Sequence, residues 1–295
     1  MKNAILFLVL LLSLGPIGYA QSFNETQLLE HLETLSSDRY EGRRTGEKGN
    51  LLARAYIIKT FKELGVIPFG SKFEHTFTFE ARDKEYNAAN ILAQVKGTKF
   101  PDTYIVISAH YDHLGVHEGA IYNGADDDAS GIAALFAFAE YLSKNPPKHT
   151  VILAAFDAEE IGLKGAYYFV DKMKNTNILV NLNMDMISRS AKDELYVVGT
   201  PHHEKLKGII DSFQNPTTSK LIIGHDGNDD QEDWTNASDH GAFHKAKIPF
   251  LYFGNEDHAG YHHPSDDFEN ITPAFYKNAV QILLSVFAQI DQNGL

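Results

Sequence analysis

The chain has 295 residues, 39 acidic and 26 basic side chains, a formal net charge of −13 and no cysteine. Because neutralising phosphates requires clustered Lys and Arg, this excess of acid argues against a nucleic-acid partner. The absence of cysteine excludes disulfides, thiolate zinc sites, iron–sulfur clusters and cysteine nucleophiles, so any transition metal must be held by His, Asp or Glu.

The first twenty residues have the pattern of a secretory signal peptide. Lys2 precedes an apolar run over residues 4–15, and the small residues Gly18 and Ala20 then flank Tyr19. An uncleaved membrane anchor is the alternative, but a run of about a dozen residues is short of the roughly 20 that span a bilayer. We expect residues 1–20 to be removed, leaving an exported chain, secreted or periplasmic, with no stable membrane anchor.

The rest of the chain alternates between helical patterns and apolar strands. Runs without polar alternation indicate strands covered on both faces, and their order predicts an α/β fold, a three-layer α/β/α sandwich whose mixed central sheet is largely parallel. We expect residues 21–295 to form a single domain. The expected helices are 27–35, 49–64, 130–143, 161–173, 202–213 and 273–290, and the expected strands are 73–79, 88–95, 104–108, 151–156, 178–183 and 248–253.

Acidic residues and histidines follow the ends of these strands, where open α/β sheets place their sites. Taken singly, each has an ordinary explanation: a solvated turn, a helix cap, or a histidine-rich surface loop. Asp185 is harder to explain, because it is embedded among apolar residues. Asp112 lies two residues after His110 and can orient its imidazole. Together the strand ends supply the ligands for two zinc ions that share one carboxylate.

The sequence resembles the M28 family of zinc peptidases, particularly its secreted bacterial aminopeptidases. The resemblance covers nearly the whole chain after the signal peptide, and its motifs occur in the family's order. The matching segments are 41–46 (EGRRTG), 109–113 (AHYDH), 124–131 (GADDDASG), 157–162 (DAEEIG), 183–185 (NMD), 238–240 (SDH) and 261–266 (YHHPSD).

The resemblance implies a metal centre with two Zn²⁺ ions per chain. By position, His110 and Asp185 would hold one zinc, Glu160 and His262 the other, and Asp127 would bridge them. Residue 263 is also a histidine where the family commonly has threonine, so either histidine of this pair could be the ligand; the spacing to the following aspartate favours the first. The resemblance also implies a cis peptide bond after the bridging aspartate.

The same resemblance implies a zinc peptidase in which a metal-bridging hydroxide attacks the peptide bond. Glu159 matches the general base, Asp112 the partner that orients the first histidine, and Tyr261 a position that stabilises the oxyanion in some members. Carboxypeptidases need a cation for the substrate carboxylate, usually arginine, and from residue 83 onward the chain has only Arg189. An acidic site instead suits a free amine, so we expect an aminopeptidase acting on peptides with a free N-terminus.

Two alternatives remain open. A single-zinc glutaminyl cyclase shares the fold and several of these motifs, and a non-catalytic, receptor-like relative would share the fold without the chemistry. The number of zinc ions per chain distinguishes the first alternative, and a hydrolysis assay distinguishes the second. Nothing in the sequence indicates a dimerisation domain, so we expect a monomer.

Overall fold

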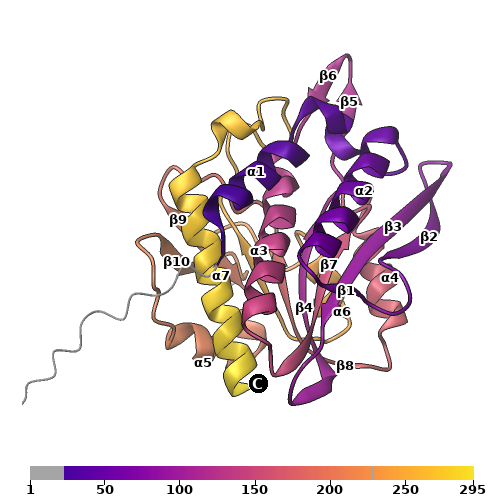
Figure 1. The fold of residues 1–295 in the computed structure, drawn as a ribbon. Coiled ribbons are helices and arrows are strands. Elements are labelled where there is room, and N and C mark those ends of the chain that lie inside the picture. The colour runs from indigo at the N-terminus through magenta and orange to yellow at the C-terminus, as the bar shows by residue number, and fades with distance from the viewer. Residues whose placement is uncertain (1–22, 228) are drawn as a thin grey trace, which may run out of the picture.

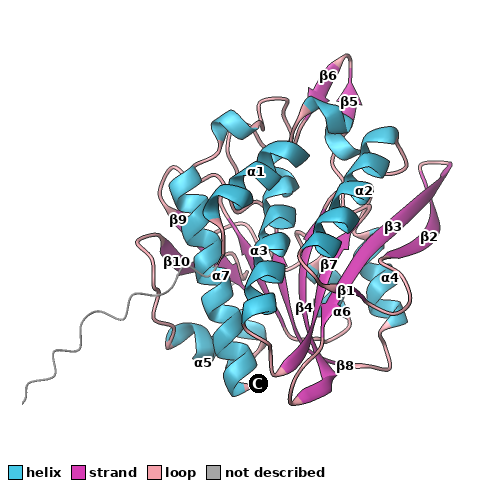
Figure 2. Ribbon diagram, viewed as in Figure 1, coloured by secondary structure: helices cyan, strands magenta, loops and turns pink. Residues whose placement is uncertain are grey.

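The computed structural model describes residues 23–227 and 229–295; the expected signal peptide lies outside these residues. The chain forms a central sheet with helices on both faces (Figures 1 and 2). The α-helices are α1 (Glu25–Leu35), α2 (Lys48–Glu63), α3 (Ser130–Lys144), α4 (Lys164–Lys172), α5 (Glu204–Asp211), α6 (His240–Lys245) and α7 (Pro273–Asn293). Shorter helical turns are η1 (Asp38–Arg43), η2 (Ala125–Ala129), η3 (Thr200–His202) and η4 (Phe268–Asn270).

Nine strands form one sheet in the order β1-β3-β7-β4-β8-β11-β9-β10, with β2 paired to β3. They are β1 (Ile67–Pro68), β2 (Glu74–Ala81), β3 (Lys84–Val95), β4 (Phe100–His110), β7 (His149–Phe156), β8 (Asn177–Met184), β9 (Glu194–Val198), β10 (Lys220–Ile223) and β11 (Phe250–Gly254). A separate hairpin joins β5 (Gly115–His117) to β6 (Ala120–Tyr122) and projects at the top of Figure 1.

The four central strands, β7, β4, β8 and β11, run parallel to one another. Antiparallel pairs flank them, since β3 runs against β7 and β9 runs against β11. The predicted α/β fold with a mixed central sheet is therefore confirmed, with its parallel part at the centre. Because the central strands share one direction, their carboxyl ends meet at one edge of the sheet.

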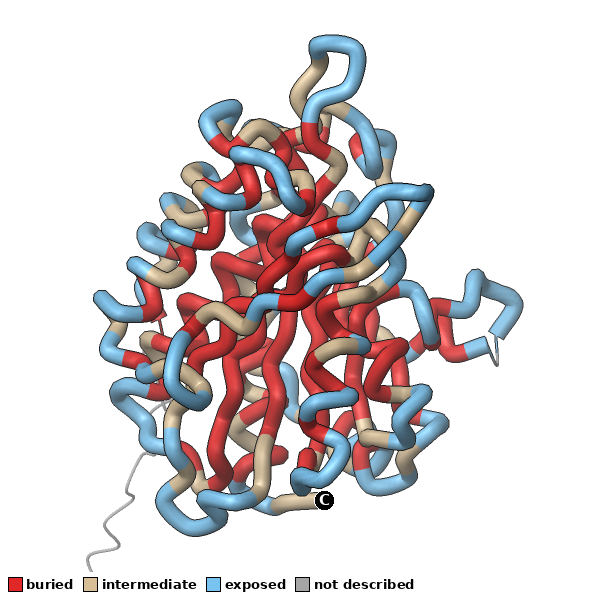
Figure 3. The backbone as a smooth tube through the Cα atoms, turned by 90° about the vertical axis from the view of Figure 1, so that its right-hand side faces the viewer, coloured by how far each residue is buried: buried red, intermediate tan, exposed pale blue. Residues whose placement is uncertain are grey.

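Alternate residues of each central strand enter different apolar layers, as the two-residue period of a strand requires. In β4, Ile105 and Ile107 pack with α1, α2, α3, α5 and α7, whereas Val106 packs with α4 and α6 on the opposite face. Buried positions accordingly concentrate in the central strands and in the inner faces of the helices (Figure 3). This packing fixes both faces of the sheet and leaves its edge to carry polar residues.

Element boundaries differ from the prediction where the backbone turns sharply. The helix expected from residue 161 begins at Lys164, because Gly162 and Leu163 both have positive φ. The strands β9 and β10 and the helix α6 were not predicted. None of the helices in the described part of the chain has the length and apolar composition needed to cross a membrane.

Candidate metal centre

The predicted site residues meet at the carboxyl edge of the parallel strands. His110 is the last residue of β4, Glu159 and Glu160 follow β7, and Asp185 follows β8. Together with Asp127, Tyr261 and His262 they line one cavity of about 180 Å³. The structure thus brings together residues from five separate segments, and Asp112 lies directly behind them.

Asp127 stands between two groups of side chains, and each of its carboxylate oxygens faces one of them. Oδ1 lies 3.2 Å from Nε2 of His110, which is itself 3.4 Å from Oδ1 of Asp185. Oδ2 lies 3.3 Å from Nε2 of His262, which is 3.6 Å from Oε2 of Glu160. A carboxylate in this position can bridge two cations.

The three adjacent aspartates have different partners. Asp126 accepts hydrogen bonds from the backbone N–H (2.6 Å) and hydroxyl (2.8 Å) of Ser188. Asp128 accepts one from the N–H of Gly131 (2.9 Å) at the start of α3. The outer two carboxylates therefore hold the backbone, although a carboxylate oxygen of Asp128 also lies within 4.8 Å of donor atoms of His110 and Asp185. Asp127 is the one of the three whose two oxygens face different histidines. The peptide bond between Asp127 and Asp128 is cis, as the resemblance implies.

The electrostatics of the cluster favour a cation. Burial alone would raise the pKa of Asp127, but His113, His110 and His262 hold it well below its usual range. Burial likewise opposes a charge on His110, yet Asp185 and Asp127 raise its pKa well above the usual value. Carboxylates confined this closely need positive charge beside them. The imidazole nitrogens and carboxylate oxygens are also the ligands that zinc takes in hydrolytic sites, so the residues present fit the expected metal.

The structure distinguishes the two adjacent histidines by their contacts. His262 faces Asp127 and Glu160, as described above. His263 turns away, and its Nδ1 accepts a hydrogen bond from the backbone N–H of Ser265 (3.1 Å). Of this pair, only His262 is placed to bind a metal at the cluster.

Asp112 acts in a different way from the one expected. Strand β4 ends at His110, so Asp112 is no longer on the strand, and its backbone oxygen rather than its carboxylate lies closest to Nδ1 of His110 (3.0 Å against 3.9 Å). Its carboxylate accepts hydrogen bonds from the backbone N–H groups of Glu159 (3.0 Å) and Glu160 (3.3 Å). Asp112 therefore orients the imidazole through its main chain and fixes the acidic pair through its side chain.

Glu159 has the environment of a proton acceptor. Burial raises its pKa well above the usual value; His110 is the next-largest influence and opposes the shift, and the charges of Asp185, Asp239 and Glu160 add to it. A carboxyl group with a raised pKa is a better base once ionised. Tyr261, 39% exposed, lines the same cavity, and burial together with Asp127 raises the pKa of its phenol, which stays protonated and able to donate a hydrogen bond.

Two residues at the cluster had no role assigned from the sequence. Nδ1 of His113 lies 2.7 Å from Oε1 of Glu160, and its ring donor atom lies within 4.8 Å of donor oxygens of Asp127 and Glu160. Asp239 is buried, its pKa is raised to about 7 by that burial, and neither of its carboxylate oxygens has a hydrogen-bond partner among the described residues. Both residues lie in segments that match the family's motifs, and this position was the feature of the sequence that could have indicated a role for them.

A buried arginine supports the cluster from behind. Arg43 donates hydrogen bonds to the backbone oxygens of Leu35 (2.8 Å), Tyr111 (2.9 Å), Asn123 and Gly124 (2.8 Å). These oxygens belong to the end of α1, the segment after β4 and the segment before η2. One side chain thus ties the N-terminal part of the chain to the segments that carry His110 and Asp127.

Similar proteins include both peptidases and cyclases. A probable zinc metalloprotease from Pyrenophora teres f. teres is 32% identical over 154 residues, covering 48% of this chain and 31% of that protein. Aminopeptidase YwaD from Bacillus subtilis is 30% identical over 188 residues, covering 60% of this chain and 38% of that protein. The chain thus spans only about a third of the length of the curated relatives it matches.

Two solved structures have the same fold. An aminopeptidase from Aneurinibacillus sp. strain AM-1 superposes with a TM-score of 0.71 at 18% identity, covering 91% of this chain and 94% of that one. A glutaminyl cyclase from Fimbriiglobus ruber gives 0.71 at 15% identity, covering 91% and 95%. At these identities the similarity establishes the fold and does not distinguish the two activities.

The family itself is established by sequence. The model described as Peptidase family M28 matches residues 90–287, about two thirds of the chain. The matched region contains all the histidines and carboxylates that line the cavity, from His110 to His262. The chain therefore belongs to peptidase family M28.

Proposed function

We propose that this chain is an exported aminopeptidase that binds two zinc ions and removes N-terminal residues from peptides. The observation that carries the proposal is the position of Asp127, whose two carboxylate oxygens face different histidines at 3.2 Å and 3.3 Å. His110 and Asp185 would hold one ion and Glu160 and His262 the other. Zinc in such a pair supplies Lewis-acid chemistry, polarising the scissile carbonyl and lowering the pKa of water.

The protein's own side chains would carry the proton and stabilise the charge. Glu159 accepts the proton of the attacking water and delivers it to the leaving amine. Tyr261 keeps its phenolic proton and donates a hydrogen bond to the oxygen that becomes negative. Asp112 keeps Glu159 in place by accepting the hydrogen bond of its backbone N–H.

The choice of the amino end rests on the charge of the cavity. Besides the ligand carboxylates, Glu232 and Asp257 line it. A free ammonium group would be attracted to this wall, whereas a C-terminal carboxylate would be repelled. The name of one relative, aminopeptidase YwaD, supports the choice of the amino end.

The direct test combines metal analysis with a substrate panel. We expect about two zinc ions per purified chain, hydrolysis of aminoacyl-p-nitroanilides that stops when a chelator removes the metal, and no hydrolysis once the substrate amine is acetylated. Cleavage of N-terminally blocked peptides instead would contradict the assignment to the amino end. A protein with one zinc ion that converts N-terminal glutamine to pyroglutamate without hydrolysing peptides would be a glutaminyl cyclase.

Export is tested separately, by the mass of the N-terminus after expression in a secreting bacterial host. Cleavage after Ala20 would leave Gln21 as the first residue. A full-length chain retained in the membrane fraction would contradict export.

A further inference from the structure

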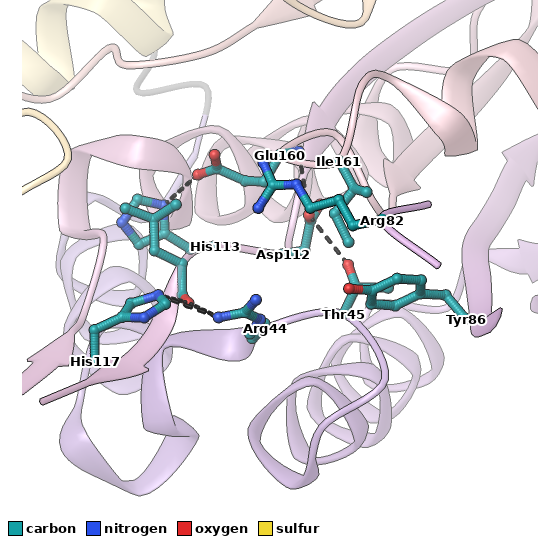
Figure 4. A pocket seen from close by; sticks show the side chains of 10 residues that line it. Arg44, Thr45, Arg82, Tyr86, Asp112, His113, His117, Glu160 and Ile161 are labelled. Atoms are coloured by element: carbon teal, nitrogen blue, oxygen red, sulfur yellow. Dashed lines mark hydrogen bonds and ion pairs between the residues drawn. The ribbon is translucent and has the colours of Figure 1, made fainter. Parts of the chain in front are cut away.

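A second cavity, of about 240 Å³, lies next to the metal centre (Figure 4). Besides His113, three basic residues line it: Arg44 directly after η1, Arg82 in the turn between β2 and β3, and His117 at the end of β5. Glu160 and His113 form its boundary with the centre. Because Glu160 lines this cavity and the acidic one, the two cavities adjoin at a predicted metal ligand.

The acidic groups of this second cavity already have partners. The carboxylate of Asp112 accepts hydrogen bonds from Glu159, Glu160 and the hydroxyl of Thr45 (3.2 Å). Glu160 contacts Nδ1 of His113 at 2.7 Å. Among the described residues, neither carboxylate forms an ion pair with Arg44 or Arg82.

Arg44 and Arg82 differ in their polar contacts. Nη1 of Arg44 lies 3.2 Å from Nε2 of His117, and its Nε lies 3.6 Å from a carboxylate oxygen of Glu47, which fixes the guanidinium at the wall. Arg82 is exposed and makes no hydrogen bond or ion pair within residues 23–227 and 229–295. Its planar set of N–H donors is therefore available, and this set matches the two oxygens of a carboxylate.

We propose that this cavity binds a carboxylate on the leaving-group side of the scissile bond, with Arg82 as its principal ligand and Arg44 as a fixed charge. The proposal rests on the aminopeptidase function: when the N-terminal residue occupies the acidic cavity, the second residue lies beyond Glu160. At about 240 Å³ the cavity is smaller than the roughly 300–1,000 Å³ of pockets for larger ligands, which suits a single residue.

This carboxylate has two chemical sources, the C-terminus of a dipeptide or an acidic side chain in the second position of a longer peptide. The arginine count from residue 83 onward did not reveal it, because both arginines precede that point in the sequence. The enzyme would thus bind the substrate amine with acidic side chains in one cavity. It would bind a carboxylate one residue further along the peptide with basic side chains in the other.

Two pairs of substrates with the same N-terminal residue test the proposal. Leu-Ala against Leu-Ala-amide measures the contribution of a C-terminal carboxylate, and Leu-Asp-amide against Leu-Asn-amide that of an acidic side chain. We expect kcat/KM to favour the carboxylate by about tenfold or more in at least one pair, as a charge-assisted hydrogen bond of about 1.5–3 kcal/mol implies. Which pair shows the preference identifies the source.

Variants assign the preference to Arg82. In Arg82→Gln the ratio within the pair should fall to about one, mainly through a higher KM for the carboxylate substrate, and Arg82→Lys should retain part of it. Arg39→Gln, at an exposed arginine outside the cavity, should keep the wild-type ratio. Equal kcat/KM within both pairs, or an unchanged ratio in Arg82→Gln, would reject this inference while leaving the aminopeptidase intact. If the zinc-loaded protein hydrolyses none of the four substrates, both this inference and the aminopeptidase function are rejected.

Discussion

At the scale of single residues, the centre depends on carboxylates that hold backbone rather than metal. Asp266 accepts hydrogen bonds from the backbone N–H groups of Asp126 (3.1 Å) and Asp127 (3.0 Å), and Asp128 accepts one from the N–H of His110 (3.2 Å). The geometry of the bridging residue is thus imposed by neighbouring carboxylates that accept hydrogen bonds from the backbone around it. A substitution at these positions would disturb the site without removing a ligand.

The role of Glu159 as a proton acceptor can be tested separately from its structural contacts. Glu159→Gln keeps the size of the side chain and the backbone hydrogen bond to Asp112 but removes the proton acceptor. We expect kcat to fall by about 10²–10⁴-fold, with the zinc content of the protein unchanged by atomic absorption. Glu63→Gln, at an exposed glutamate of α2, serves as the control and should leave kcat unchanged. Near-normal turnover of Glu159→Gln would show that another group takes the proton.

Sequence reasoning located most of this cluster because its residues follow strands that are recognisable from apolar runs. It assigned no role to His113, since proximity to Glu160 depends on how the chain turns after β4. The contributions of Arg44 and Arg82 were equally invisible, because the paths of η1 and the β2–β3 turn over the site are set by tertiary packing. Local pattern predicts where a strand ends, and it does not predict which distant loop covers that end.

At the scale of secondary-structure elements, α2 is fastened to the end of β7 through one buried carboxylate. Asp157 accepts hydrogen bonds from Asn50 (3.0 Å) and Arg54 (3.1 Å) of α2 and from the backbone N–H of Ala89 (2.9 Å) in β3. The next residues after Asp157 lead to Glu159. The helix therefore sets where the acidic pair begins.

Arg54→Met should destabilise the fold because it leaves the buried charge of Asp157 without its counter-ion, while the other hydrogen-bond donors remain. Removing one partner of such a pair costs about 3–5 kcal/mol, and we expect the free energy of unfolding in urea to fall by about 3 kcal/mol. Arg39→Met, at an exposed position of the same N-terminal region, should change it by less than about 0.5 kcal/mol. Equal stabilities of the two variants would contradict a stabilising role for the pair.

The long helices and the central strands were predicted and several short elements were not, for a physical reason. Helices such as α3 and α7 and the central strands bury continuous apolar surface, so their periodicity is visible in the sequence. The strand β10 has only exposed and half-buried residues, and α6 is a six-residue helix. Such elements exist because neighbouring segments hold them, which a local pattern does not record.

At the scale of the whole molecule, the N-terminal region and the matched region share one core. The family model begins at residue 90, yet Leu28 and Leu32 of α1 and Ile57 and Phe61 of α2 are buried in the same apolar cluster as α3 and α7. Removing this region would expose that cluster and also take away the arginines discussed above. The site and the stability of the molecule therefore depend on residues outside the matched segment.

The dependence of stability on pH should carry a contribution from His240 in α6. Burial lowers its pKa to about 3. Its ring stacks against those of Phe250 and Tyr252, and its Nε2 lies 2.8 Å from the backbone oxygen of Trp234. The unfolded chain binds a proton at this histidine below about pH 6.5 and the folded chain does not. The contribution of the neutral histidine to the free energy of unfolding is therefore fully present above pH 6.5. As the pH falls towards 3, this contribution decreases by up to about 1.4 kcal/mol per pH unit.

His240→Gln retains the N–H donor and cannot be protonated, so it isolates this effect. With metal removed by chelator, the stability difference between wild type and variant should shift by about 2 kcal/mol in favour of the variant between pH 8 and pH 5. Urea denaturation at both pH values measures it. A difference that does not change with pH would show that His240 does not carry this linkage.

The hydrogen bonds of Arg43 have a consequence for local unfolding of the chain. Because its guanidinium donates hydrogen bonds to backbone oxygens of three segments at once, opening any one of them breaks a hydrogen bond of the same buried cation, and we expect the three segments to unfold together. Tyr261 and His262, by contrast, lie on an exposed loop at the mouth of the cavity. The wall of the cavity near His110 and Asp127 is therefore held by a buried side chain that joins three segments, whereas Tyr261 and His262 meet solvent directly.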